Sequence, residues 1–112
     1  MKWNMRRIED VVVFDLKGPL EGAADSYRIK DEIKARLNEG SSKFLLNMAG
    51  VDFVNSTGVG IIASAYSTIT SNDGVMKICG ANSKVSKIFM ITKLLEIFDS
   101  YYDEDDALKS FR

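Results

Sequence analysis

The sequence predicts a single α/β domain with a mostly parallel sheet of four or five strands, an antiparallel edge, and about four helices that lie mainly on one face. The candidate elements run as two strands and then as alternating helices and strands, an order typical of parallel sheets. The chain has 112 residues, a length that suits one domain with one core. Its hydrophobic share of 46% and charged share of 28% are those of a globular chain rather than a disordered one.

The first two predicted strands lie within residues 3–17. Residues 11–16 are the stronger candidate, because they form a nearly continuous β-branched apolar run that suits a central strand. Gly18 and Pro19 end this run and Gly22 follows closely, so we expect a turn there.

The first predicted helix spans residues 24–38. Ile29, Ile33 and Leu37 recur at i, i+4 and i+8, which places them on one helix face, while charged side chains occupy the other faces. Gly40 follows at the position where a left-handed C-cap is favoured, so the helix is expected to end just before it.

A short buried strand is predicted at residues 44–48, followed by a loop over residues 49–55. A second helix is expected over residues 56–69, and its small residues would let it lie close to a sheet. The predicted core face of this helix consists of residues at i, i+3, i+7 and i+10: Val59, Ile62, Tyr66 and Ile69.

Residues 72–74 form a predicted turn, and residues 75–79 a further strand. Asn82 or Ser83 can cap a third helix, because both side chains accept hydrogen bonds from free backbone N–H groups. The apolar residues of that helix are Val85, Ile88 and Phe89.

Residues 94–98 are expected to lead into a last short strand or extended piece. Residues 103–111 read as a terminal helix whose acidic first turn and basic end match the helix dipole. The sequence shows no internal repeat and no low-complexity linker, so we expect one domain over residues 1–112.

The charges of the chain nearly cancel, with 15 basic residues against 16 acidic ones. Neither half of the chain is distinctly basic, so nucleic acid is not an expected partner. The longest uninterrupted apolar runs, residues 11–14 and 88–91, have four residues each. We therefore expect no membrane span, no signal peptide and no direct membrane insertion.

Two absences narrow the chemistry. The chain has no histidine, which disfavours a Ser-His-Asp triad and any histidine metal ligand. It has one cysteine, Cys79, within an apolar stretch, so we expect a small core residue rather than a nucleophile, a disulfide or a zinc ligand. No catalytic residue, metal or cofactor is predicted, and the chain is expected to be cytoplasmic, in a reducing compartment.

The segment best suited to carry function is residues 54–62, where a strand end, a polar loop and a helix start follow in quick succession. Ser56 and Thr57 place two hydroxyls side by side, and two glycines follow. One interpretation is purely local: Asn55 or Ser56 caps the helix, while Gly58 and Gly60 allow close packing on the sheet.

The other interpretation is functional. A phosphate on a hydroxyl at a helix N-terminus meets free backbone N–H groups and the positive end of the helix dipole, which suits reversible phosphorylation. A nucleotide loop is a weaker alternative, because Gly58-x-Gly60 lacks a third glycine and no GxxxxGK[ST] pattern occurs. Nucleophilic catalysis by Ser56 lacks a histidine base and a GxSxG motif.

Residues 55–60, Asn-Ser-Thr-Gly-Val-Gly, together with the preceding residues 47–54, resemble the signature of the STAS domain, whose pattern is close to D-S-[ST]-G-L-G. Residues 18–21 resemble the G-x-L-D turn of that family, and residues 94–98 its L-x-x-x-F segment. The resemblance covers essentially the whole chain and implies a single STAS domain.

The resemblance implies the function of a bacterial anti-sigma factor antagonist. In that family the unphosphorylated antagonist captures a serine kinase that doubles as the anti-sigma factor, and phosphorylation releases it. A PP2C-type phosphatase resets the cycle. The phosphorylated serine of the family falls on Ser56, with Thr57 as the lesser candidate, and the kinase supplies the ATP and magnesium. The partner-binding residues implied are Leu20, Glu21, Gly22, Asn55, Ser56, Thr57, Gly58 and Val59.

Two residues depart from the family pattern. Asn55 stands where an acid is usual, so charge repulsion of a phosphate on the next residue is absent, and Glu21 replaces an aspartate. An alternative function therefore stays open: a non-switching STAS scaffold subunit of a stress-signalling or lipid-transport complex. Leu20, Glu21 and Gly22 also have a purely local interpretation, as a plain surface turn.

Overall fold

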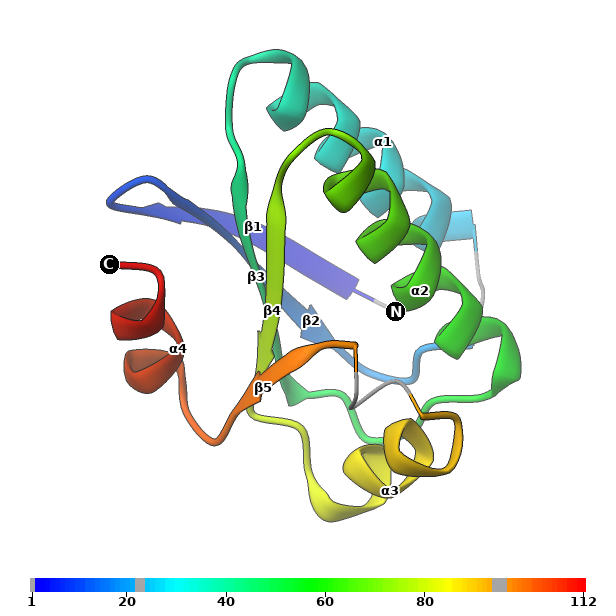
Figure 1. Ribbon diagram of the computed structural model, residues 1–112. Coiled ribbons are helices and arrows are strands. Elements are labelled where there is room, and N and C mark those ends of the chain that lie inside the picture. Colours follow the sequence, from blue (N-terminus) through cyan, green and yellow to red (C-terminus); the bar gives the residue numbers. More distant parts are fainter. Residues whose placement is uncertain (1, 22–23, 94–96) are drawn as a thin grey trace.

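The computed structural model describes residues 2–21, 24–93 and 97–112, and it shows a sheet with helices on both faces (Figure 1). The elements run in the predicted order. They are β1 (Lys2–Ile8), β2 (Val11–Lys17), α1 (Ala24–Asn38), β3 (Lys43–Gly50), α2 (Ser56–Ser71), β4 (Val75–Cys79), α3 (Ser83–Ile91), β5 (Asp99–Tyr101) and α4 (Glu104–Ser110).

The five strands form one sheet in the order β1-β2-β3-β4-β5. β1 pairs with β2 antiparallel, and each later pair is parallel. Phe14 on β2 lies opposite Leu46 on β3, which lies opposite Ile78 on β4. The predicted fold class is therefore confirmed. Because β2, β3 and β4 are parallel, the loops after them meet at one edge of the sheet, where α/β proteins commonly bind ligands.

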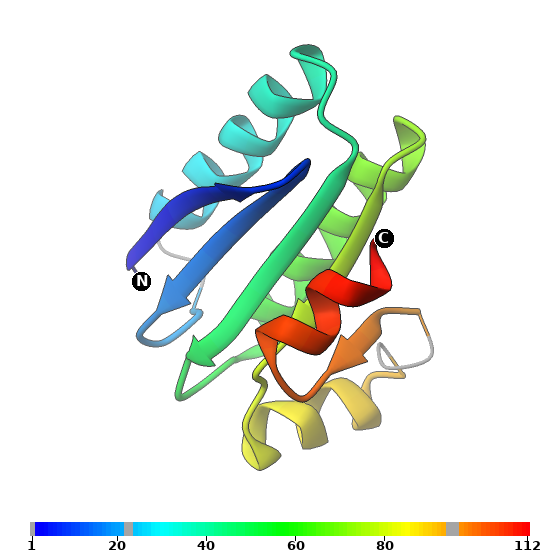
Figure 2. The same cartoon turned by 90° about the vertical axis from the view of Figure 1, so that its left-hand side faces the viewer.

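The helices cover the two faces of the sheet unequally. In Figure 2, α4 lies in front of the sheet and α1 and α2 lie behind it, while α3 sits beyond the ends of the strands. The larger core packs between the sheet and α1 and α2, and it includes Phe14, Phe44 and Leu46. A smaller cluster under α4 contains Val13 and Cys79. The expected burial of the central strands is confirmed, since these side chains are almost completely inaccessible to solvent.

The helix boundaries follow the capping residues that the sequence indicated. α1 ends at Asn38, and Gly40 adopts the left-handed conformation with φ of +99°. Asn82 caps α3, and its side chain accepts a hydrogen bond from the backbone N–H of Val85 at 2.8 Å. The last helix is shorter than the predicted residues 103–111, because Asp103 is its N-cap and accepts a hydrogen bond from Asp106 N–H at 2.8 Å.

The ends of one strand and one helix differ from the sequence prediction. The strand predicted to end at residue 48 continues to Gly50, because the carbonyl of Gly50 accepts a hydrogen bond from Gly18 N–H at 2.8 Å and extends the pairing. α2 continues two residues beyond Ile69. Residues 94–96 of the predicted 94–98 segment lie outside the described residues; Phe98 is buried, and the last strand begins after it.

The buried face of α2 is also wider than predicted. Ile62 and Ile69 are buried as expected, while Val59 and Tyr66 are only partly buried and pack against the edge of the core. The remaining buried residues of this helix are small: Gly58 and Ala65. Small side chains on this face let α2 approach the sheet closely.

Candidate functional site

The junction between β3 and α2 is bound to the loop that follows β2. Leu20 forms an isolated parallel bridge with Val54. Its N–H donates to the carbonyl of Phe53 at 2.8 Å, and its own carbonyl accepts from Asn55 N–H at 3.3 Å. Two loops that are 34 residues apart in sequence, counted between Leu20 and Val54, therefore form one unit at the carboxyl edge of the sheet.

Asn55 is the N-cap of α2. Its Oδ1 accepts a hydrogen bond from Gly58 N–H at 2.8 Å, and its carbonyl accepts the first helical bond from Val59 N–H at 2.9 Å. The backbone of Asn55 is extended, with φ of −101° and ψ of −177°, as an N-cap requires. The sequence left Asn55 and Ser56 as alternative caps, and the structure assigns the role to Asn55.

Ser56 is thereby left as the first helical residue, with an exposed hydroxyl. Thr57 is exposed as well, and neither hydroxyl has a hydrogen-bond partner among the described residues. The backbone N–H groups of Ser56 and Thr57 are likewise unpaired within the described part of the chain. The first turn of α2 carries no charged side chain. A rigid hydroxyl, free N–H donors and the positive end of the helix dipole meet here, which can accommodate an anion.

The other candidate residues divide into surface and interior positions. Glu21 and the hydroxyl residues face solvent, and Val59 is half-buried. The side chain of Leu20 is fully buried and Gly58 packs against the Leu20 backbone, so these two residues shape the junction from inside. Gly22 lies outside the described residues.

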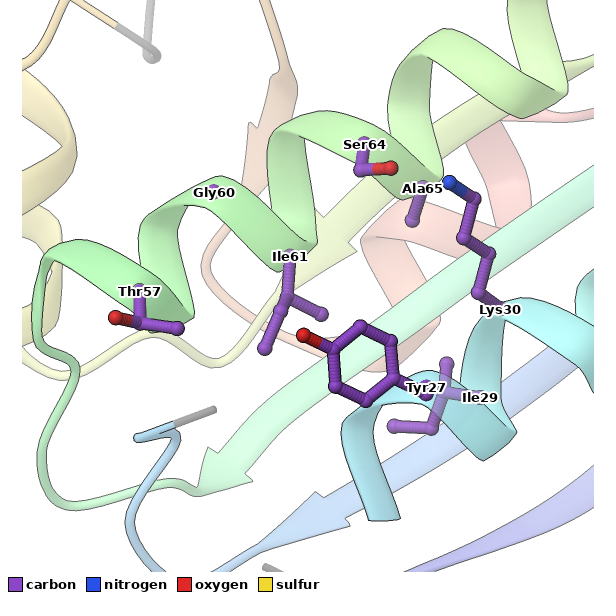
Figure 3. A pocket seen from close by; sticks show the side chains of 8 residues that line it. All are labelled: Tyr27, Ile29, Lys30, Thr57, Gly60, Ile61, Ser64 and Ala65. Atoms are coloured by element: carbon purple, nitrogen blue, oxygen red, sulfur yellow. The ribbon is translucent and has the colours of Figure 1, made fainter. Parts of the chain in front are cut away.

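The sequence analysis missed a groove between α1 and α2, which reaches the same junction at Thr57 (Figure 3). Its volume is about 340 Å³, and it includes Tyr27 and Lys30 of α1. On the α2 side Gly60 and Ser64 leave the space open. The signal in the sequence was the pair of small residues one turn apart, which was interpreted only as a means of close packing.

Arg6 links the sheet to α4 through ion pairs. It donates two hydrogen bonds to Asp15, at 2.6 and 2.8 Å, and also pairs with Glu104 of α4; these bonds raise the pKa of the Arg6 guanidinium.

Cys79 lies in the smaller core cluster. Burial beneath α4 raises the pKa of the Cys79 thiol to about 12, with smaller contributions from the carboxylates of Glu104 and Asp15. The expectation that Cys79 is a core residue is confirmed.

Within residues 2–21, 24–93 and 97–112, no group of three or more potential ligand side chains is arranged to hold a metal ion. None of the helices described is long and apolar enough to cross a membrane.

Comparisons with known proteins agree with this geometry. A protein of Paenibacillus polymyxa named anti-sigma F factor antagonist is 24% identical over 110 residues, which cover 94% of this chain and 90% of that protein. The structure of an anti-sigma factor antagonist from Mycobacterium paratuberculosis matches with a TM-score of 0.82 at 19% identity, covering 97% of this chain and 92% of that one.

The phosphorylated form of SpoIIAA, a Bacillus cell fate determinant, matches with a TM-score of 0.77 at 19% identity, covering 99% of this chain and 100% of that one. At these identities the structural likeness shows the fold. The sequence model of the STAS domain matches residues 2–107, nearly the whole chain. The chain therefore belongs to the STAS domain family.

Proposed function

We propose that this protein is an anti-sigma factor antagonist whose binding to a serine-kinase anti-sigma factor is controlled by phosphorylation of Ser56. The observation that carries the proposal is the exposed Ser56 hydroxyl at the first position of α2, which has no partner among the described residues. Relatives named as antagonists of anti-sigma factors support the same function. In this proposal residues 1–112 act as one STAS domain in the cytoplasm.

The unphosphorylated protein presents an uncharged helix start at the junction, because the first turn of α2 has no charged side chain. The kinase docks on Glu21, Ser56 and Thr57, and the Ser56 hydroxyl enters its active site. Leu20 and Gly58 hold the two loops in one arrangement, so little conformational freedom is lost on binding.

Phosphorylation adds about −1.5 to −2 charges to this surface. The free N–H groups of Ser56 and Thr57 and the helix dipole stabilise the phosphate by roughly 0.3–1 kcal/mol, so the domain does not need to refold. Release of the kinase follows from the cost of burying an unpaired charge in the interface, on the order of 3–5 kcal/mol.

The chain acts in this cycle as a substrate and a binding protein rather than as an enzyme. The kinase supplies ATP and magnesium, so the chain requires no cofactor. A PP2C-type phosphatase removes the phosphate and restores binding.

The proposal is tested with histidine-kinase-like ATPases encoded in the same genome, each incubated with this protein, ATP and magnesium. We expect one kinase to add a single phosphate, which mass spectrometry places on Ser56. Ser56→Ala abolishes the modification, while Thr57→Ala, the matched neighbour, retains it. Phosphate on Thr57 would move the site by one residue, and phosphorylation without any loss of kinase affinity would reject the switch.

A second candidate function is a STAS scaffold subunit that binds its partners constitutively, in a stress-signalling or lipid-transport complex. The observation that favours it is Asn55, which caps α2 without supplying the acid that the family pattern has there. Stable complexes with none of the tested kinases acting on Ser56 would support this function over the switch.

A further inference from the structure

We propose that the groove between α1 and α2 binds a small amphipathic anion, an aryl or acyl group that ends in one carboxylate or sulfonate. The site goes beyond the proposed switch, because binding there needs no kinase. Its shape, its residue chemistry and its unpaired cation each contribute to the assignment.

The groove has the size and lining of a small-molecule site. Its volume of about 340 Å³ lies in the range of roughly 300–1,000 Å³ for ligand pockets. Ile29 and Ala65 form buried apolar walls, and Ile61 lies between them and the junction. In Figure 3 the ring of Tyr27 lies across from Ile61, so an aromatic or aliphatic group between them is covered on both sides.

Gly60 is the residue that keeps the groove open. A Cβ built at this position meets no atom within 4 Å from the described residues outside its own stretch of helix, and the residue adopts no positive φ, so neither packing nor backbone conformation requires a glycine. Glycine costs a helix interior about 0.8–1 kcal/mol relative to alanine. Gly58 differs, because its lack of a side chain is required by the contact with Leu20. Binding in the groove gives Gly60 a function that the fold does not.

Lys30 gives the groove its polarity. It is half-buried on α1, and its amine forms no ion pair or hydrogen bond with any described residue. In Figure 3 the side chain reaches toward Ser64 and Ala65 at one end of the groove. None of the described residues that line the site is acidic. An unpaired cation beside apolar walls is complementary to an apolar ligand with a single anionic group.

The ligand would span the first two turns of α2. Thr57 marks the other end of the groove, seven residues from Ser64, which is about 10 Å along a helix. An anion at Lys30 therefore places the apolar part of the ligand along Gly60 and Ile61, toward the junction.

The test uses 8-anilinonaphthalene-1-sulfonate as the probe and the folded, full-length protein in fluorescence titrations. We expect saturable binding of one probe per chain. Its neutral relative N-phenyl-1-naphthylamine should bind about fivefold more weakly, because it cannot pair with Lys30. Nuclear magnetic resonance shifts of backbone amides should localise the probe to α1 and the first turns of α2.

Two variants and two matched controls decide the assignment. Gly60→Leu fills the groove and should weaken binding about tenfold or more, while Ser67→Leu, two turns further along α2 and outside the groove, should not. Lys30→Gln should weaken binding about fivefold, while Lys34→Gln, one turn away on α1, should not. Gly60→Ala, which is expected to fold at least as well as the native chain, should give an intermediate loss.

Affinities that stay at the native value in both Gly60→Leu and Lys30→Gln would overturn the site. Equal binding of the charged and neutral probes would overturn the anionic part of the assignment. Both results are independent of Ser56 phosphorylation, so failure here and failure of the proposed switch are distinguishable.

Discussion

Gly58 lies against the backbone of Leu20 so closely that a Cβ on Gly58 would stand 2.0 Å from the Leu20 carbonyl oxygen. The same carbonyl accepts the hydrogen bond from Asn55 N–H. The start of α2 and the loop after β2 are thus fixed to each other by backbone atoms, which have little freedom to move aside. This contact positions the exposed hydroxyls of Ser56 and Thr57.

Gly58→Ala is expected to destabilise the protein by about 2–4 kcal/mol, because the loop after β2 must move to admit the methyl group. Gly60→Ala is the matched control in the same helix, where open space and higher helix propensity predict a gain of about 0.5–1 kcal/mol. Urea unfolding followed by circular dichroism measures both. Equal effects of the two substitutions would contradict the role assigned to the Leu20 contact.

Asn55→Ala removes the side-chain acceptor for Gly58 N–H and is expected to cost about 1 kcal/mol of unfolding free energy. Asn55→Asp keeps an acceptor at the cap and adds a favourable charge–dipole interaction, so its stability should equal or exceed that of the native protein. The two variants are compared in the same urea titration. A larger loss in Asn55→Asp than in Asn55→Ala would show that the side chain does not act as the cap.

Charge at the junction should control kinase binding. We expect Ser56→Asp to weaken binding, Asn55→Asp to weaken it less, and phosphorylated Asn55→Asp to dissociate more completely than the phosphorylated native protein. The measurement is a titration of the kinase with each form at one ionic strength. Equal affinities for the native protein and Ser56→Asp would leave electrostatic release without support.

Arg6→Met leaves the carboxylates of Asp15 and Glu104 near each other without a cation. The site is partly exposed and therefore screened, so we expect a loss of about 1 kcal/mol at low ionic strength that shrinks in 1 M NaCl, the upper end of the range for exposed ion pairs. Arg112→Met, which removes an exposed pair with Glu9, is the control and should change stability by less than about 0.5 kcal/mol. A salt-independent loss in Arg6→Met would point to packing instead.

Cys79 should resist alkylation in the folded state, because burial holds the pKa of its thiol at about 12 and denies access to the reagent. Iodoacetamide at pH 8 should modify the thiol only at the rate of unfolding, with the urea-unfolded protein as the positive control. Rapid modification of the native protein would contradict the burial.

The same thiol should make stability depend on alkaline pH. The unfolded thiol loses its proton near pH 9 while the folded one keeps it to about pH 12, so this contribution to stability is complete below pH 9 and declines above it. Between these two pKa values the free energy of unfolding falls by roughly 1.4 kcal/mol per pH unit because of this thiol. Between pH 9 and pH 10.5 the native protein should lose about 1–2 kcal/mol more than Cys79→Ala. If the free energy of unfolding depends on pH in the same way in the native protein and in Cys79→Ala, the raised pKa of the Cys79 thiol is contradicted.

The sequence by itself determined the elements and their order. The apolar run of β2 and the i, i+4, i+8 spacing of Ile29, Ile33 and Leu37 report burial on a strand and on one helix face, and both are local patterns. Gly40 and Asn82 marked helix ends through conformational and hydrogen-bonding preferences that act within a few residues. The position of Ser56 at a strand-to-helix junction followed from the same local signals.

Only the tertiary structure decided which contacts these elements make with one another. The continuation of β3 to Gly50 depends on a hydrogen bond from Gly18, and the need for glycine at position 58 depends on Leu20, each more than 30 residues away. Gly58 and Gly60 look equivalent in the sequence. In the structure Gly58 packs against the Leu20 backbone, whereas Gly60 leaves the groove between α1 and α2 open. The difference arises because α1 and the loop after β2 approach α2 at different turns, and that approach is set by packing across the whole sheet.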